Sequence, residues 1–317
     1  NNTFHIDLGL NGSFEAGDSH HFDWDVTYAY DRMNAKLSTD NLVNTYNLRQ
    51  ALGPSFDDNG SIRCGRPGAV VAGCVPMDIL SARGGLTPDQ LGYILYDDRS
   101  SFKSTTQDFT ANITGNIVPL PAGDLSFAAG YEYRNLRGQF NPDPITAAGY
   151  SSGNRTLPTQ GGYHVNEAYW ELSAPVLKEL PGAQELTFNA SGRYSKYSNF
   201  GMTRNYKYGF TWHPIQDLLV RGTYADGFRA PTIEDLYQGN ADDYAFYNDP
   251  CDSADGAAAF SGAVAAACAR HGVPPGYLQP NGGYGKQSAL PFQRGGNPSL
   301  KPETSHSKTL GLVYSPS

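Results

Sequence analysis

The sequence predicts an all-β protein, an antiparallel meander of about nine long strands that crosses a membrane. Three observations predict it. Polar and apolar residues alternate over much of the chain, short connections alternate with long ones, and tyrosine and tryptophan gather toward the ends of the apolar faces. Together these features are typical of a transmembrane β-barrel, whose strands face lipid on one side and water on the other.

Four strands are expected in the first half of the chain, each with apolar side chains on one face. In the first of them, Phe4 and Ile6 share a face, whereas His5 lies on the other. Successive side chains of a strand point to opposite sides, so this alternation puts one side in an apolar medium and the other in a polar one. The expected strands are 3–11, 22–30, 108–117 and 125–134.

Five further strands are expected in the second half. The alternation is clear around Phe188 and Ala190, which lie opposite Asn189. Each strand is expected to have roughly 9–11 residues, enough to cross a bilayer on a tilt. The expected strands are 167–174, 185–194, 206–213, 218–225 and 304–314.

The connections between these strands alternate in length, except that the link at 198–203 is short where a long one is expected. Outer-membrane barrels have short turns on one side and long extracellular loops on the other. We therefore predict that the long connections are extracellular and carry structure of their own, since compact domains seldom contain loops of this length. The short connections are 15–20, 120–123, 177–183 and 214–217, and the long ones are 34–101, 138–163 and 229–301.

The aromatic residues distinguish a membrane barrel from a soluble β-sandwich, whose strands alternate in the same way. Tyr28, Tyr133 and Tyr224 lie toward the long-loop ends of their strands, whereas Trp170 and Trp212 lie toward the short-turn ends. Such rings gather at the two membrane interfaces because the ring is apolar and its OH or NH stays hydrated. The opposite faces carry Asp, Glu, Arg, Asn and Thr, which suit a water-filled lumen.

Composition argues against several other classes of protein. The formal net charge is -8 and no run of Lys or Arg occurs, so we predict no nucleic-acid partner. No apolar stretch approaches the roughly 18 residues of a membrane-spanning helix. We expect no metal or cofactor, and the EF-hand-like start at Asp57 and Asp58 lacks its closing Glu. We also expect no catalytic residue: no nucleophile elbow with Gly-x-Ser-x-Gly spacing is expected, and GYSSGN at 149–154 is interpreted as a plain turn.

The four cysteines form two close pairs, Cys64 with Cys74 and Cys251 with Cys268, in Gly-, Pro- and Ala-rich segments. In an oxidising compartment this arrangement indicates two disulfides within loops. Zinc binding is the alternative, but there is no CxxC motif and no nearby pair of histidines. We therefore predict disulfides and an extracytoplasmic location. No signal peptide is visible, and the natural N-terminus is expected to lie upstream.

Two short helices are expected within the long loops. Thr87, Pro88 and Gln90 supply an N-cap, a proline at the first helical position and a capping-box glutamine. The Ala-rich segment 255–270 is followed by His271 and Gly272, a typical helix end. We interpret both helices as loop scaffolding.

The stretch RGTYADGFRAPTIEDLYQGN begins as a strand and then breaks its alternation. Gly227 is expected to let the chain leave the ladder, and Pro231 cannot donate a hydrogen bond to it. Arg229 is expected to form a local ion pair with Glu234 and Asp235 at the root of the long loop, in preference to contacting a ligand.

This stretch, together with GGNPSLKPETSHSKTLGLVYSP near the end of the chain, resembles TonB-dependent outer-membrane receptors. In that family a strand ends in a Phe-Arg-Ala-Pro corner before an acidic-Leu-aromatic step, and an Asn-Pro-x-Leu-Lys-Pro-Glu turn leads into the next strand. Softer matches lie at 130–134, 166–177 and 193–201 and in the cysteine pairs. The matching residues are Phe228, Arg229, Ala230, Pro231, Glu234, Asp235, Leu236 and Tyr237, then Asn297, Pro298, Leu300, Lys301, Pro302 and Glu303.

The resemblance covers nearly the whole chain and implies the bacterial outer membrane, with membrane lipid around the barrel. It implies a 22-stranded barrel, of which residues 1–317 would be an internal part. The plug domain and the segment that engages the TonB complex would then lie in the missing N-terminal region. Alone, the chain should form an open, curved sheet with two unpaired edges.

The resemblance implies active import of a scarce nutrient, such as siderophore–iron, cobalamin, an oligosaccharide or a peptide, and no enzyme activity. Tyr244, Phe246 and Tyr247 are candidate ligand contacts, with a self-packed loop as the alternative. Lys301 and Glu303 are expected to have structural roles. Two other functions stay open at this point: a secreted soluble all-β glycan-binding module, and a passive porin without a plug.

Overall fold

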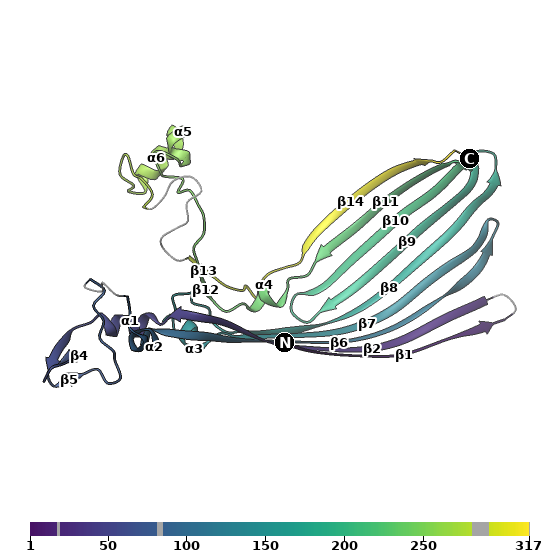
Figure 1. Cartoon of the computed structure of the whole chain (residues 1–317). Helices are drawn as coiled ribbons and strands as arrows, with labels where there is room; N and C mark the ends of the chain where they lie inside the picture. Colours follow the sequence, from purple (N-terminus) through teal and green to yellow (C-terminus); the bar gives the residue numbers. More distant parts are fainter. Residues whose placement is uncertain (18–19, 81–84, 281–291, 317) are drawn as a thin grey trace.

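The computed structural model describes residues 1–17, 20–80, 85–280 and 292–316. Its main feature is a nine-stranded antiparallel sheet in the order β1-β2-β6-β7-β8-β9-β10-β11-β14, so each strand pairs with the next large strand along the chain. Figure 1 shows an open, curved wall with β1 and β14 at its edges. The predicted meander and its open form are confirmed. Parts of the predicted connections, at 18–19, 81–84 and 281–291, lie outside the described residues.

The strands are longer than predicted, with 12 to 26 residues each, so the expected length was wrong. Alternation marks only the part of a strand that separates lipid from water. Beyond it, β2 and β6 continue as a paired ribbon up to Val43 opposite Leu95, with polar residues on both faces. The strands are β1 (Asn2–Ala16), β2 (His20–Val43), β6 (Leu95–Leu120), β7 (Gly123–Asn141), β8 (Thr159–Leu180), β9 (Ala183–Tyr197), β10 (Gly201–Ile215), β11 (Leu218–Arg229) and β14 (Glu303–Tyr314).

Long loops lie at one end of the strands and short turns at the other, apart from the short β9–β10 hairpin at the long-loop end (Figure 1). Because the strands extend, the first two long connections shrink to 44–94 and 142–158. None of the helices in the described residues is long and apolar enough to cross a membrane. The first loop contains α1 (Thr45–Ala51), β3 (Ser55–Asp58), β4 (Ser61–Arg66), β5 (Ala69–Val70) and α2 (Pro88–Ile94), and the second contains α3 (Pro144–Ala147).

The predicted local features of the loops are largely found. Thr87 and Gln90 form the expected capping box of α2, and both predicted disulfides are present. The predicted helix at 255–270 is instead two helices, because Ser261 breaks the first and caps the second by accepting a hydrogen bond from the Val264 N–H. The third loop contains α4 (Ile233–Tyr237), β12 (Ala241–Asp243), α5 (Ala257–Phe260), α6 (Gly262–Arg270) and β13 (Phe292–Arg294).

The Cys251–Cys268 segment is anchored by the carboxylate of Asp252, which is 4% exposed. It accepts hydrogen bonds from the backbone N–H groups of Gln279, Asp255 and Ala254, at 2.7, 2.9 and 2.8 Å. These donors lower the pKa of Asp252 below its ordinary value because they favour the charged carboxylate.

We therefore expect this segment to depend on pH. A folded pKa below the unfolded one gives stabilisation that is complete well above about pH 4 and is lost as pH falls through the folded pKa. Amide exchange at Gln279, corrected for the intrinsic rate, should stay slow from neutral pH to mildly acidic pH and become fast in strong acid. Asp252→Asn should remove this pH dependence. Unchanged protection of the wild-type amide in strong acid would contradict the assignment.

The two faces of the sheet differ as the alternation predicts. On one face, which we call the outer face, Tyr28 lies opposite Phe109, which lies opposite Tyr133. No helix or strand packs over the outer face in the part of the chain that the structure describes, and Leu10 and Leu310 at its two edges are 71% and 77% exposed. An apolar face without a covering layer belongs in lipid. The other face, the inner face, is polar.

Candidate functional site

The root of the third loop lies where β11 and β14 separate. Gly227 stays in the ladder opposite Ser305, and the pairing ends only at Arg229 opposite Glu303. The prediction that the chain leaves the ladder at Gly227 was therefore wrong. A Cβ on Gly227 would lie 2.8 Å from the Ser305 Oγ, so the glycine serves close packing between the strands.

Arg229 joins the two roots of this loop. Its Nε and Nη2 donate to the two carboxylate oxygens of Glu303, at 3.1 and 2.6 Å, and its Nη1 lies 3.6 Å from Asp235 Oδ2. The expected partner Asp235 is therefore present, whereas Glu234 forms no ion pair with Arg229. The bidentate contact with Glu303 fixes the orientation of the Arg229 side chain. It adds little stability, because exposed ion pairs are weak.

Helix α4 follows the corner at once and begins with a reciprocal cap. Thr232 Oγ1 accepts from the Asp235 N–H at 3.0 Å, and Asp235 Oδ2 accepts from the Thr232 N–H at 2.9 Å. The hydrogen bonds from Thr232 lower the pKa of Asp235. The cap fixes the start of a helix that is too short to be stable alone.

Helix α4 packs on the inner face over a pair of glycines. Gly138 and Gly161 lie directly opposite each other on β7 and β8. A Cβ on Gly138 would lie 3.3 Å from Ile233 Cγ2, and one on Gly161 would lie 2.1 Å from the Tyr237 ring. The two glycines thus form a flat seat for two side chains of α4.

The second family motif completes the support of α4. The Asn297 N–H donates to the Asp235 carbonyl and the Gly296 N–H donates to the Gln238 carbonyl, both at 2.8 Å. Leu236, between them, is 1% exposed. The structure therefore brings the Phe-Arg-Ala-Pro corner and the Asn-Pro-x-Leu-Lys-Pro-Glu turn together around one helix, while Lys301 lies exposed beside them.

Between α4 and the inner face lies a pocket of about 590 Å³, which we call the α4 pocket. Most of the surface that lines it is apolar, and polar residues line it as well, a combination that is typical of small-molecule sites. The apolar residues are Phe102, Leu136, Phe140, Tyr163 and Ile233, and Glu234 and Gln238 are among the polar ones.

The three loop residues predicted to contact a ligand lie elsewhere. Tyr244, Phe246 and Tyr247 are absent from the described lining of the α4 pocket. Phe246 is 68% exposed, and the Tyr247 ring packs edge-on against Phe292 with centroids 5.3 Å apart. Their ligand role stays a prediction. The α4 pocket itself was missed, although a pair of glycines within a strand signals close approach of other atoms.

Farther along the inner face, four charged residues form a network on the wall. Arg134 and Arg193 each lie 3.2 to 3.4 Å from the carboxylates of both Glu132 and Glu167. Glu167 is 3% exposed and also accepts a hydrogen bond from the Ser195 hydroxyl. Such a paired polar network suits the wall of a hydrated lumen.

No arrangement for catalysis or metal binding is evident in the described residues. The segment GYSSG does have Gly-x-Ser-x-Gly spacing, but Ser151 lies on an isolated bridge to Asn44 and its Oγ accepts from the Gly153 N–H at 2.9 Å. It is not on the strand-to-helix elbow that exposes a nucleophile. No group of three or more His, Cys, Asp or Glu residues that could hold a metal was found there.

The comparisons with known proteins identify the family. A family model described as TonB dependent receptor-like, beta-barrel, matches residues 1–317, so the chain belongs to this family of bacterial outer-membrane proteins. The family consists of transport receptors rather than enzymes.

Comparison with individual proteins adds little. No curated protein matches the chain. Among solved structures it is similar to the siderophore receptor PirA from Acinetobacter baumannii, with 11% identity and a TM-score of 0.38, over 99% of this chain and 41% of that one. The chain therefore spans less than half the length of that receptor, and we transfer neither its ligand nor its geometry.

Proposed function

We propose that this chain is part of the barrel domain of a receptor that captures a scarce nutrient outside the cell for TonB-energised import. The α4 pocket is its outward capture site. The observation that carries this proposal is the seating of α4: two motifs at the loop root hold it on Gly138 and Gly161, so an extracellular loop folds onto the inner face. The family resemblance supports a plug domain and the TonB complex as partners.

The lining of the α4 pocket favours a ligand with an aromatic or apolar face, such as a siderophore or cobalamin. Burying about 200 Å² of apolar ligand surface would gain on the order of 5 kcal/mol. The cost of association is of similar size, so the pocket alone binds weakly. The loops that carry Tyr244, Phe246 and Tyr247 would then supply further contacts.

The test uses the full-length receptor and a panel of ferric siderophores, cobalamin, oligosaccharides and peptides, followed by calorimetry on the ligand that binds. Phe140→Ala is expected to weaken binding about tenfold, since it removes one buried aromatic contact. Phe188→Ala, on the outer face, is the matched control and should leave the affinity unchanged. Equal affinity of the two variants for the ligand would show that capture occurs elsewhere.

A soluble glycan-binding module is disfavoured by the uncovered outer face, where Leu8 is 62% exposed. Such a module would be monodisperse in plain buffer. A passive porin differs by lacking a plug. Planar-bilayer recordings of the full-length receptor separate these functions, because a plugged receptor should conduct no steady ion current and a porin should conduct one.

A further inference from the structure

The wall of the α4 pocket carries aromatic rings on both sides of the glycine seat. On the side toward the long loops, Phe102 of β6 lies opposite Phe140 of β7. On the side toward the short turns, Tyr163 of β8 lies opposite Leu136 of β7. These rows are separated from the seat by two residues along each strand, or about 6.6 Å. Three rings therefore line the pocket, and an aromatic ring attracts a cation to its face.

Helix α4 presents a different side chain in each direction. Ile233 and Tyr237 rest on the glycine seat, and Leu236 is buried. Glu234 and Gln238 lie one turn apart and line the α4 pocket. Among the described residues of this lining, Glu234 is the single charged one. The helix therefore brings one carboxylate to a pocket whose wall is apolar and aromatic.

The carboxylate of Glu234 is not used to hold the helix in place. The cap of α4 is formed by Thr232 and Asp235, and the pairing with Arg229 is also made by Asp235. Within the described ranges, the Glu234 side chain forms neither a hydrogen bond nor an ion pair. The residue is exposed. Its charge is therefore available to a ligand in the α4 pocket.

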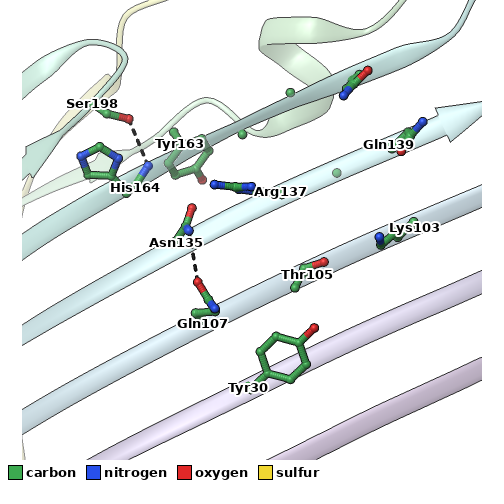
Figure 2. Close-up of a pocket in the computed structure, with 14 residues that line it drawn as sticks. Tyr30, Lys103, Thr105, Gln107, Asn135, Arg137, Gln139, Tyr163, His164 and Ser198 are labelled. Atoms are coloured by element: carbon green, nitrogen blue, oxygen red, sulfur yellow. Dashed lines mark hydrogen bonds between the residues drawn. The ribbon is translucent and has the colours of Figure 1, made fainter.

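The basic residues of the neighbouring strands point away from this carboxylate. Lys103 is an even number of residues from Phe109 on β6, so it shares the outer face. Arg137 has the same relation to Tyr133 on β7. Figure 2 shows both cations in a separate pocket of about 690 Å³. Arg134 does lie on the inner face, but the carboxylates of the wall network already pair with it. No Lys, Arg or His occurs in the described lining of the α4 pocket.

We propose that the α4 pocket binds a cationic part of the nutrient, an ammonium or related organic cation attached to an apolar or aromatic body. The rings of the wall hold the body and attract the cation, and Glu234 pairs with it. An anionic group would meet a carboxylate and no basic side chain, so the pocket rejects it. The preference for a cation presupposes that the α4 pocket is the capture site of the proposed function, and it adds the charge of the ligand group that occupies the pocket.

The test uses three probes that share one phenethyl body: phenethylammonium, phenethyl alcohol and hydrocinnamate. Their binding to the full-length receptor in phosphatidylcholine nanodiscs is followed by saturation-transfer NMR, with empty nanodiscs as the blank. The ammonium should bind at least about threefold more tightly than the alcohol, because it gains an exposed ion pair and a cation–π contact. It should bind at least about tenfold more tightly than the carboxylate, which Glu234 repels.

Two glutamate variants assign this ranking to one side chain. Glu234→Gln keeps the size of the side chain and removes its charge, so it should weaken the ammonium about threefold and leave the affinity for the alcohol unchanged. Glu179→Gln removes the same charge near the short-turn end of β8 and should keep the wild-type ranking. Heat-modifiable migration should be the same for both variants and the wild type.

Phe140→Ala separates failure of the cation preference from failure of the capture site. It should weaken all three probes, because it removes an aromatic contact that they share. If it does so but Glu234→Gln leaves the ranking unchanged, or if hydrocinnamate binds most tightly, the cation preference is wrong and the capture site stands. Absence of phenethylammonium binding would also overturn the preference alone, since calorimetry on the nutrient tests the capture site separately. Probe binding that Phe140→Ala leaves unchanged would contradict both.

Discussion

Ala190→Arg is expected to lower the free energy of unfolding of the receptor by about 2–4 kcal/mol, the cost of a cation on the lipid face near the bilayer centre. Ala190 lies in β9 opposite Leu172 and Tyr208, both on the outer face. Asn189→Arg, one residue earlier, places the same charge on the inner face opposite Ser173 and Gly209. It should change the free energy by less than about 1 kcal/mol, as charges on the lumen side do.

The measurement is urea unfolding of both variants of the full-length receptor in lipid vesicles, followed by tryptophan fluorescence. The two variants have the same net charge and the substitutions are at neighbouring positions. A difference between their stabilities therefore reports the face of the sheet and not the added charge or the location along the strand. Equal loss of stability in both variants would contradict the assignment of faces, and a larger loss in Asn189→Arg would reverse it.

Gly161→Leu is expected to abolish detectable nutrient binding while the barrel still folds. A Cβ at this position would lie 2.1 Å from the Tyr237 ring, so α4 cannot stay seated beside the α4 pocket. Helix α4 spans only Ile233–Tyr237, and its contact with the sheet is made to β8 and to Gly138 of β7. The loss should exceed the roughly tenfold effect expected for Phe140→Ala, since the whole wall of the pocket moves.

The matched control for Gly161→Leu is Gly9→Ala, another strand glycine on the inner face. A Cβ on Gly9 would lie 3.5 Å from Thr27 Cγ2, an ordinary contact. Nutrient affinity by calorimetry and heat-modifiable migration on a gel should be normal for Gly9→Ala. For Gly161→Leu only the migration should be normal. Undiminished affinity in Gly161→Leu would show that seating of α4 is not needed for capture.

The sheet could be predicted from the sequence because each strand separates an apolar medium from water. Asn189 and Ala190 must face opposite media, and this requirement appears directly as alternation. The same pattern could not predict where β2 and β6 end near the long loops. Beyond the membrane both faces of this ribbon are in water, so its sequence does not need to alternate. The cysteine pairs were predicted correctly because their partners are close in sequence.

The candidate site was harder to predict because its parts come from distant segments. Arg229 was expected to pair within its own loop, but its main partner is Glu303, 74 residues away. Similarly, the seat of α4 joins Gly138 and Gly161 from two strands to Ile233 and Tyr237 from the third loop. A single sequence marks such positions as glycines but does not show what approaches them.

The most direct test of the two faces of the sheet uses spin labels. Each label is placed singly at one of the positions 187–190 of β9 in the membrane-embedded receptor, and it reports whether lipid or water surrounds that side chain. Oxygen, which concentrates in the bilayer, should relax labels at 188 and 190 more strongly, whereas a water-soluble nickel complex should favour 187 and 189. A period of two residues in the ratio of these accessibilities is the predicted result. Equal ratios at all four positions, or the opposite phase, would contradict the account.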